Sequence, residues 1–134
     1  MPILSALALA VALPLPPADP AGTWRTPRGG VVQVERCGAA LCGRIVSVPT
    51  IPGNPHALDW KNRDTAQRKR PLKGVAVLSG FTGGPARWTS GRIYNPEDGG
   101  SYTGSIDASD PAVLKVKGCI AAFLCRTQNW TRVR

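Results

Sequence analysis

The chain has 134 residues with 17 basic and 8 acidic side chains, so its formal net charge is +9. This length favours a single domain, and a hydrophobic content of 43% excludes a chain that is disordered throughout. Glycine (15) and proline (13) are together too frequent for a coiled coil or a long-helix protein. The composition therefore predicts one small domain of short elements separated by turns.

The N-terminal part of the chain is a separate block, because every charged residue lies at or after Asp19. Residues 3–13 form an apolar run of the length found in secretory signal peptides. Residues 10–12 (Ala-Val-Ala) offer one cleavage site and Ala18 offers a second. The positive charge that usually precedes such a run is missing, and no cysteine follows that would indicate a lipoprotein. We predict a signal peptide over 1–18, one domain over 19–134, and a periplasmic or secreted protein. No other apolar run is long enough to be a transmembrane span.

Short strand-like runs with turn signals between them make up most of the remaining chain. Residues 113–117 alternate apolar and basic side chains, Asp98-Gly99 is a typical hairpin turn, and no long helical periodicity appears. The predicted strands are 22–26, 31–36, 42–48, 74–81, 87–94, 101–107, 112–117 and 126–133. Such a series predicts an all-β fold, either a sandwich or a small antiparallel up-and-down β-barrel of about eight strands. We favour the barrel because closure removes exposed sheet edges.

Four cysteines behind a secretory signal indicate disulfides. Strand-like segments flank Cys37 and Cys42, and also Cys119 and Cys125, so each pair is placed to clamp a hairpin tip. Local pairing is therefore favoured, with 37–119 and 42–125 as the alternative. The spacings match neither zinc knuckles nor a redox C-x-x-C motif. The bracketed tips are apolar for turns, and we expect them to pack under a neighbouring loop rather than to form a contact surface.

The segment 49–73 lacks strand patterning and is predicted to be a long loop, with a short helix between Asp64 and Arg70. Its polar residues suit a charge-assisted network that holds the loop in place. The network residues are Asp59, Asn62, Asp64, Arg68 and Arg70. A second interpretation is an anion site formed by Lys61, Arg68 and Arg70. His56, the only histidine, is predicted to be a solvated loop residue rather than a catalytic or metal-binding one.

Two resemblances follow from motifs along the chain. Gly22-Thr23-Trp24 in the first strand and Arg132 in the last resemble the lipocalin signature, in which the basic side chain stacks over the tryptophan and closes the barrel. A longer ordered set resembles the bacterial domain-of-unknown-function family 2147 over nearly all of the chain after residue 21. It comprises G-T-W-R-T (22–26), C-G-x-x-L-C-G-R-I-V (37–46), D-x-x-N-x-D-x-x-x-R-x-R-P-L-x-G (59–74), W-x-x-G-x-I-Y-N-P-E-D-G (88–99), L-K-V-x-G-C (114–119) and W-T-R-V (130–133). This resemblance implies an exported, lipocalin-like barrel and no known reaction; Arg63 replaces the proline that the family typically has there.

The leading functional hypothesis is a non-enzymatic barrel that binds a small apolar or amphipathic ligand, with Arg68 and Arg70 holding an acidic head group. The candidate ligand-binding residues are Trp24, Trp60, Arg68, Arg70, Trp88 and Tyr102. The predicted interior residues are Trp24, Val32, Val34, Ile45, Val77, Trp88, Ile93, Tyr102 and Leu114.

The alternative is an envelope interaction module with a packed interior that acts on anionic surfaces through its basic exterior and clamped tips. The basic residues are spread over strands and one loop, which argues against a nucleic-acid partner. No cofactor, metal site or catalytic residue is predicted, and oligomeric state is left open.

Overall fold

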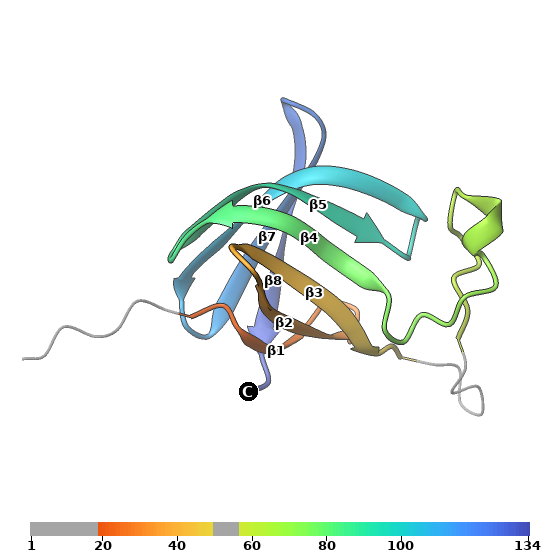
Figure 1. Ribbon diagram of the computed structural model, residues 1–134, viewed down its shortest axis with the longest axis horizontal. Helices are drawn as coiled ribbons and strands as arrows, with labels where there is room; N and C mark the ends of the chain where they lie inside the picture. Colours follow the sequence, from red (N-terminus) through yellow and green to blue (C-terminus); the bar gives the residue numbers. More distant parts are fainter. Residues whose placement is uncertain (1–18, 50–56) are drawn as a thin grey trace, which may run out of the picture.

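The computed structural model describes residues 19–49 and 57–134, which form a closed antiparallel barrel with the strands in sequence order (Figure 1). The eight strands are β1 (Gly22–Arg25), β2 (Val31–Cys37), β3 (Ala40–Ser47), β4 (Ala76–Gly83), β5 (Arg87–Asn95), β6 (Gly100–Asp110), β7 (Val113–Ala121) and β8 (Leu124–Arg132). The predicted up-and-down barrel is thus confirmed. Across the described residues there is no helix with the length and apolarity to cross a membrane. The predicted signal peptide (1–18) and His56 lie outside the described residues.

The up-and-down order gives the barrel two different ends. The closed end carries Pro20 and the β2–β3, β4–β5 and β6–β7 turns. The open end carries the β1–β2 turn, the long connection between β3 and β4, the β5–β6 turn and the β7–β8 hairpin tip. Within the described part of the chain the one 3₁₀ helix, η1 (Thr65–Gln67), lies in the long connection, beyond the end of β5 in Figure 1.

Large apolar side chains fill the half of the barrel near the closed end. Trp24, Phe81 and Leu114 are fully buried, and Trp88 is 2% exposed. Gly91 on β5 makes room for one of these rings, because a Cβ there would come within 2.2 Å of Phe81 Cγ. All of the predicted interior residues are buried or half-buried; they are Trp24, Val32, Val34, Ile45, Val77, Trp88, Ile93, Tyr102 and Leu114.

The barrel closes where β1 meets β8. The two strands pair only through Trp24 with Arg132 and Arg25 with Thr131. The Arg132 guanidinium lies 4.3 Å from the centre of the Trp24 ring and donates hydrogen bonds to the carbonyls of Asp19, Ala21 and Pro111. The face of an indole ring attracts a cation electrostatically. The contact between Arg132 and Trp24 therefore strengthens the closure, where β1 and β8 share only a short pairing.

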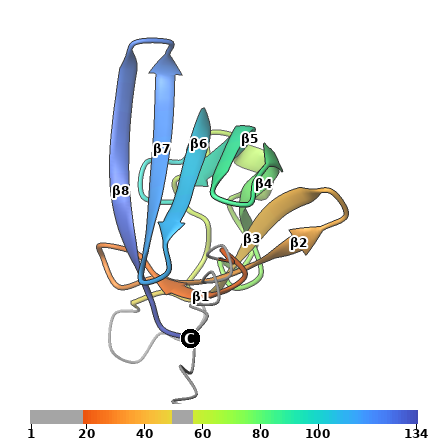
Figure 2. The same ribbon diagram turned by 90° about the vertical axis from the view of Figure 1, so that its left-hand side faces the viewer.

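Above that closure, β8 has only β7 as a strand neighbour among the described residues. β7 and β8 pair from Val113 with Thr131 up to Ala121 with Leu124. On its other side, β7 pairs with β6 only as far as Cys119. Figure 2 shows the result: the β7–β8 hairpin rises beyond the other strands.

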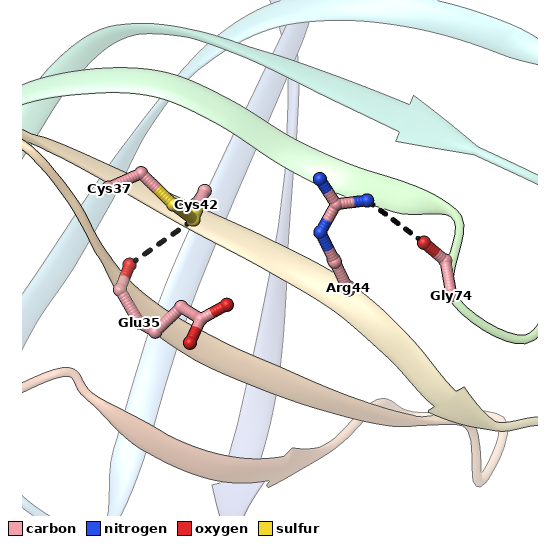
Figure 3. Close-up of a disulfide and its surroundings, with 5 residues drawn as sticks. All are labelled: Glu35, Cys37, Cys42, Arg44 and Gly74. Atoms are coloured by element: carbon pink, nitrogen blue, oxygen red, sulfur yellow. Dashed lines mark hydrogen bonds between the residues drawn. A yellow bond between two sulfur atoms is a disulfide. The ribbon is translucent and has the colours of Figure 1, made fainter.

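Both disulfides are local, which confirms the favoured pairing. Cys37–Cys42 joins β2 to β3 with a Cα–Cα distance of 5.9 Å, and Cys119–Cys125 joins directly paired positions of β7 and β8 at 4.0 Å. Figure 3 shows the first of them beside Glu35. The Glu35 carboxylate lies close to both sulfurs, but sulfurs in a disulfide are not thiolate ligands, so this group is not a metal site.

The same close-up shows how β3 is linked to the start of β4. The Arg44 guanidinium donates a hydrogen bond of 3.1 Å to the carbonyl of Gly74 (Figure 3). The backbone adds a second link, since Ile45 N donates to Val75 O and Gly74 N donates to Ile45 O. The long connection is thereby joined to β3 where it returns to the sheet.

Candidate functional site

The open half of the barrel holds a cavity of about 1250 Å³. Side chains from β2, β3, β4, β5 and β7 form its apolar floor, together with Trp130 on β8. The floor residues are Val32, Ile45, Val77, Ile93, Val116 and Trp130. They alternate with outward-facing neighbours, as β-strand geometry requires; Ile45 is 5% exposed whereas Val46 is 42% exposed.

The cavity wall also includes the β1–β2 turn and the part of β8 that has no second strand neighbour. Residues 126–129 of β8 and residues 26–28 of the turn all line it. Because β1 stops pairing with β8 at Arg25, the cavity extends to one side of the barrel as well as to its end. Apolar residues of the hairpin tip line the outer part of the same cavity.

Polar groups of both signs lie at the rim. Arg28 forms an ion pair of 3.3 Å with Glu97, and both side chains are exposed. The Tyr102 hydroxyl donates a hydrogen bond to the Asp98 carboxylate, and this bond raises the pKa of Tyr102. Arg126 adds a further cation. The rim thus offers two cations and two carboxylates around an apolar floor.

The long connection is held beside this rim by a buried carboxylate. Asp59 is 1% exposed and accepts hydrogen bonds from Asn62 Nδ2 (2.8 Å), Arg70 Nε (2.9 Å) and the Tyr94 hydroxyl. The Arg70 guanidinium also lies 5.3 Å from the centre of the Tyr94 ring. Burial first, and then the hydrogen bond to Asp59, raise the pKa of Tyr94 to about 12. The network joins the connection to β5.

Two further features hold the connection in place. Asp64 caps η1 by accepting a hydrogen bond from Ala66 N, and Arg68 Nε donates to the carbonyl of Asn62 (2.9 Å). Gly99 of the β5–β6 turn packs against the connection so closely that a Cβ there would overlap the carbonyl oxygen of Lys61. The predicted short helix and structural network are both present.

A family model described as "Uncharacterized protein conserved in bacteria (DUF2147)" matches residues 22–132, from the start of β1 to the end of β8. The chain belongs to this family.

Among solved structures, this DUF2147 chain is similar to protein HP1028 from Helicobacter pylori, which is described as belonging to the lipocalin family. The TM-score is 0.74 at 20% identity, and the match covers 85% of this chain and 82% of that chain. At this identity the likeness establishes the lipocalin-like fold and nothing finer. No curated protein matches the sequence.

The six candidate ligand-binding residues do not come together in this DUF2147 barrel. Tyr102 lines the cavity, but Trp24 and Trp88 belong to the packed half, and Trp60 is 66% exposed on the long connection. Arg68 and Arg70 are absent from the cavity wall, because their guanidinium groups are bonded to the Asn62 carbonyl and to Asp59. Of the six residues, only Tyr102 lines the cavity.

Sequence reasoning also missed residues that do line the cavity. Arg28, Glu97 and Asp98 sit in turns, where charged residues carry no special signal. The hairpin tip was expected to pack under a loop, yet Ile120 is 77% exposed and Phe123 is 83% exposed. The apolar composition of a turn was the one available signal for this surface.

Proposed function

We propose that this DUF2147 protein is a non-enzymatic carrier that binds a small amphipathic molecule in the open half of its barrel. The observation that carries the proposal is the cavity of about 1250 Å³ with its floor of aliphatic side chains and Trp130. Binding pockets in proteins are mostly apolar, with a few polar groups that orient the ligand. The lipocalin-like fold, which encloses a ligand in other barrels of this size, supports the same assignment.

The rim narrows the chemistry of the ligand. Arg28 and Arg126 are balanced by Glu97 and Asp98, so the rim suits a head group with both donors and acceptors, or a zwitterionic one, rather than a simple anion. The floor suits a hydrocarbon chain or ring system. Desolvating that apolar surface supplies the driving force for binding.

The proposal assigns no catalytic step to the protein. Asp59, the one buried carboxylate of the described residues, already accepts three hydrogen bonds. Tyr94, whose pKa is raised to about 12, stays protonated at neutral pH and so is not available as a base. The cysteines are paired in disulfides and so supply no thiolate nucleophile.

The disulfides are consistent with an extracytoplasmic protein, and we place its function in the periplasm or outside the cell.

The test is binding of the neutral fluorophore N-phenyl-1-naphthylamine, whose emission rises in apolar sites. Ile45→Trp fills the cavity floor, whereas Val46→Trp puts the same side chain on the outer face of β3. We expect Ile45→Trp to weaken binding about tenfold or more and Val46→Trp to leave it unchanged. Near-ultraviolet circular dichroism checks that both variants keep the barrel.

Native mass spectrometry of protein isolated gently from the exported fraction provides an independent test. An additional mass that is lost on denaturation is the expected result, and its value begins to identify the ligand. Absence of fluorophore binding in the wild-type protein, or equal binding by the two tryptophan variants, would show that the cavity is not a binding site.

A further inference from the structure

The tip of the β7–β8 hairpin is the largest exposed apolar feature of the described residues. Ile120, Phe123 and Leu124 are 77%, 83% and 55% exposed, and Ala121 and Ala122 separate them without any polar side chain. The other exposed large hydrophobic residues are Val46, Trp60 and Val133, which lie on three separate segments of the chain. Clustered apolar residues at one projecting point indicate a contact surface, whereas single ones do not.

The hairpin holds these side chains away from the barrel in a fixed arrangement. It rises beyond the neighbouring strands (Figure 2), and Cys119–Cys125 ties its two strands together just below the tip. Pairing continues past the disulfide to Ala121 and Leu124, with a shift of register at Ile120, so the two strands stay paired up to the turn at the tip. Strand pairing lowers the cost of bringing backbone groups into an apolar medium, and the shallow head-group boundary lets water reach the groups that are not paired.

The charged residues of the hairpin itself all have one sign. Residues 111–134 contain no aspartate or glutamate. Their basic residues are Lys115, Lys117, Arg126, Arg132 and Arg134. Lys117 and Arg126 are exposed and lie within two rungs of the disulfide, since Arg126 pairs with Gly118 and Lys117 pairs with Thr127. An apolar point backed by cations is complementary to the interface of an anionic lipid bilayer.

From this arrangement we propose that the β7–β8 hairpin docks the protein on an anionic lipid bilayer. Phe123, Leu124 and Ile120 enter the boundary between head groups and acyl chains, and Lys117 and Arg126 contact lipid phosphates. Beyond the disulfide β7 continues for two residues, Ile120 and Ala121, which span about 7 Å and so match the insertion depth of about 5–10 Å of interfacial segments.

The size of the tip favours a bilayer over a protein partner. A stable protein–protein interface needs about 800 Å² on each side, which is more than the end of a two-stranded hairpin presents. Insertion into a bilayer has no such requirement, because lipid surrounds each side chain. Since the tip residues also line the outer part of the cavity, docking turns the cavity mouth towards the membrane. The inference goes beyond ligand binding and does not depend on it.

The experiment is co-sedimentation of the full-length protein with vesicles of phosphatidylglycerol and phosphatidylethanolamine, compared with vesicles of phosphatidylcholine. Phe123→Ser with Leu124→Ser is expected to reduce partitioning by about tenfold or more, and Val46→Ser is the matched control for an exposed apolar residue. Lys117→Gln with Arg126→Gln is expected to weaken binding to the anionic vesicles and to reduce its salt dependence. Residues 3–13 are common to all variants, so differences between variants report the hairpin.

A depth measurement gives a second readout. Phe123→Trp places an indole at the tip, and its emission is expected to shift to shorter wavelength with anionic vesicles and to be quenched by lipids brominated near the glycerol end of the acyl chain. Wild-type protein supplies the background of the four native tryptophans.

Several results would overturn the proposal. One is that the variant with Phe123→Ser and Leu124→Ser partitions as strongly as the wild-type protein. Another is that the wild-type protein binds neutral and anionic vesicles equally. The third is that the oligomeric state of this variant differs from that of the wild-type protein without lipid, which would mean that the tip contacts a second copy of the chain. The cavity variant Ile45→Trp is expected to partition normally, so failure of ligand binding and failure of docking are distinguishable.

Discussion

Removing the Asp59 carboxylate tests whether a buried hydrogen-bond network holds the long connection against the barrel. In Asp59→Ala, the Tyr94 hydroxyl and the Asn62 amide lose their acceptor. A buried donor without a partner costs about 1–3 kcal/mol. Because Tyr94 is only half-buried, we take about 1 kcal/mol for its hydroxyl, so the two donors together cost about 2–4 kcal/mol in the free energy of unfolding. Arg70 adds little, because its side chain is 36% exposed and water can replace the carboxylate. The melting temperature should fall by about 10 °C.

The assay is urea unfolding of a double-mutant cycle with Tyr94→Phe. Alone, Tyr94→Phe is expected to cost about 1 kcal/mol, because it removes one hydrogen bond of a charged acceptor. In the Asp59→Ala background it should cost nothing or stabilise slightly, giving a coupling energy of about 1–2 kcal/mol. Glu35→Ala, which removes an exposed carboxylate on β2, serves as the control and should stay within about 0.5 kcal/mol of wild type. Additive effects of Asp59→Ala and Tyr94→Phe would refute the network as described.

The raised pKa of Tyr94 predicts a loss of stability in alkali: its contribution is fully present below pH 10, its unfolded pKa, and disappears as the pH rises through about 12. Unfolding measurements at increasing pH should therefore show a steeper loss for wild type than for Tyr94→Phe, and parallel curves would contradict the assignment. At the barrel closure, Arg132→Met removes the cation over Trp24 and the hydrogen bonds to three carbonyls, and should lower the free energy of unfolding by about 2 kcal/mol. Arg132→Lys should recover only part of this, because an ammonium cannot reproduce the planar set of donors; full recovery in the same unfolding assay would be evidence against the proposed geometry.

Local features of the chain were sufficient to predict the architecture of the barrel. Alternation in residues such as 113–117 and turn signals such as Asp98-Gly99 depend only on neighbouring residues, and they place eight strands close to their observed positions. The disulfides were predictable for the same reason. Cys119 and Cys125 flank one hairpin, so the turn that reverses the chain also brings the two sulfurs together.

The candidate site depended on distances that sequence neighbours do not determine. Asp59 accepts a hydrogen bond from Tyr94, 35 positions away, and nothing near either residue indicates that pairing. The Tyr94–Asp59 hydrogen bond joins the long connection to the barrel. The same carboxylate accepts a hydrogen bond from Arg70, so this guanidinium is bonded within the connection rather than directed at a ligand.

The division of the interior into a packed half and a cavity was also decided in three dimensions. Trp24 and Trp88 face inward as their strands predict, but only the barrel's closure sets how much space remains around them. The same holds for the hairpin tip. The sequence identifies Phe123 as an apolar residue in a turn, and the length of β7 and β8 relative to β6 and β1 decides that it extends past the loops that the structure describes. Strand positions follow from local periodicity, whereas cavities and exposed tips follow from how far separate strands extend past one another.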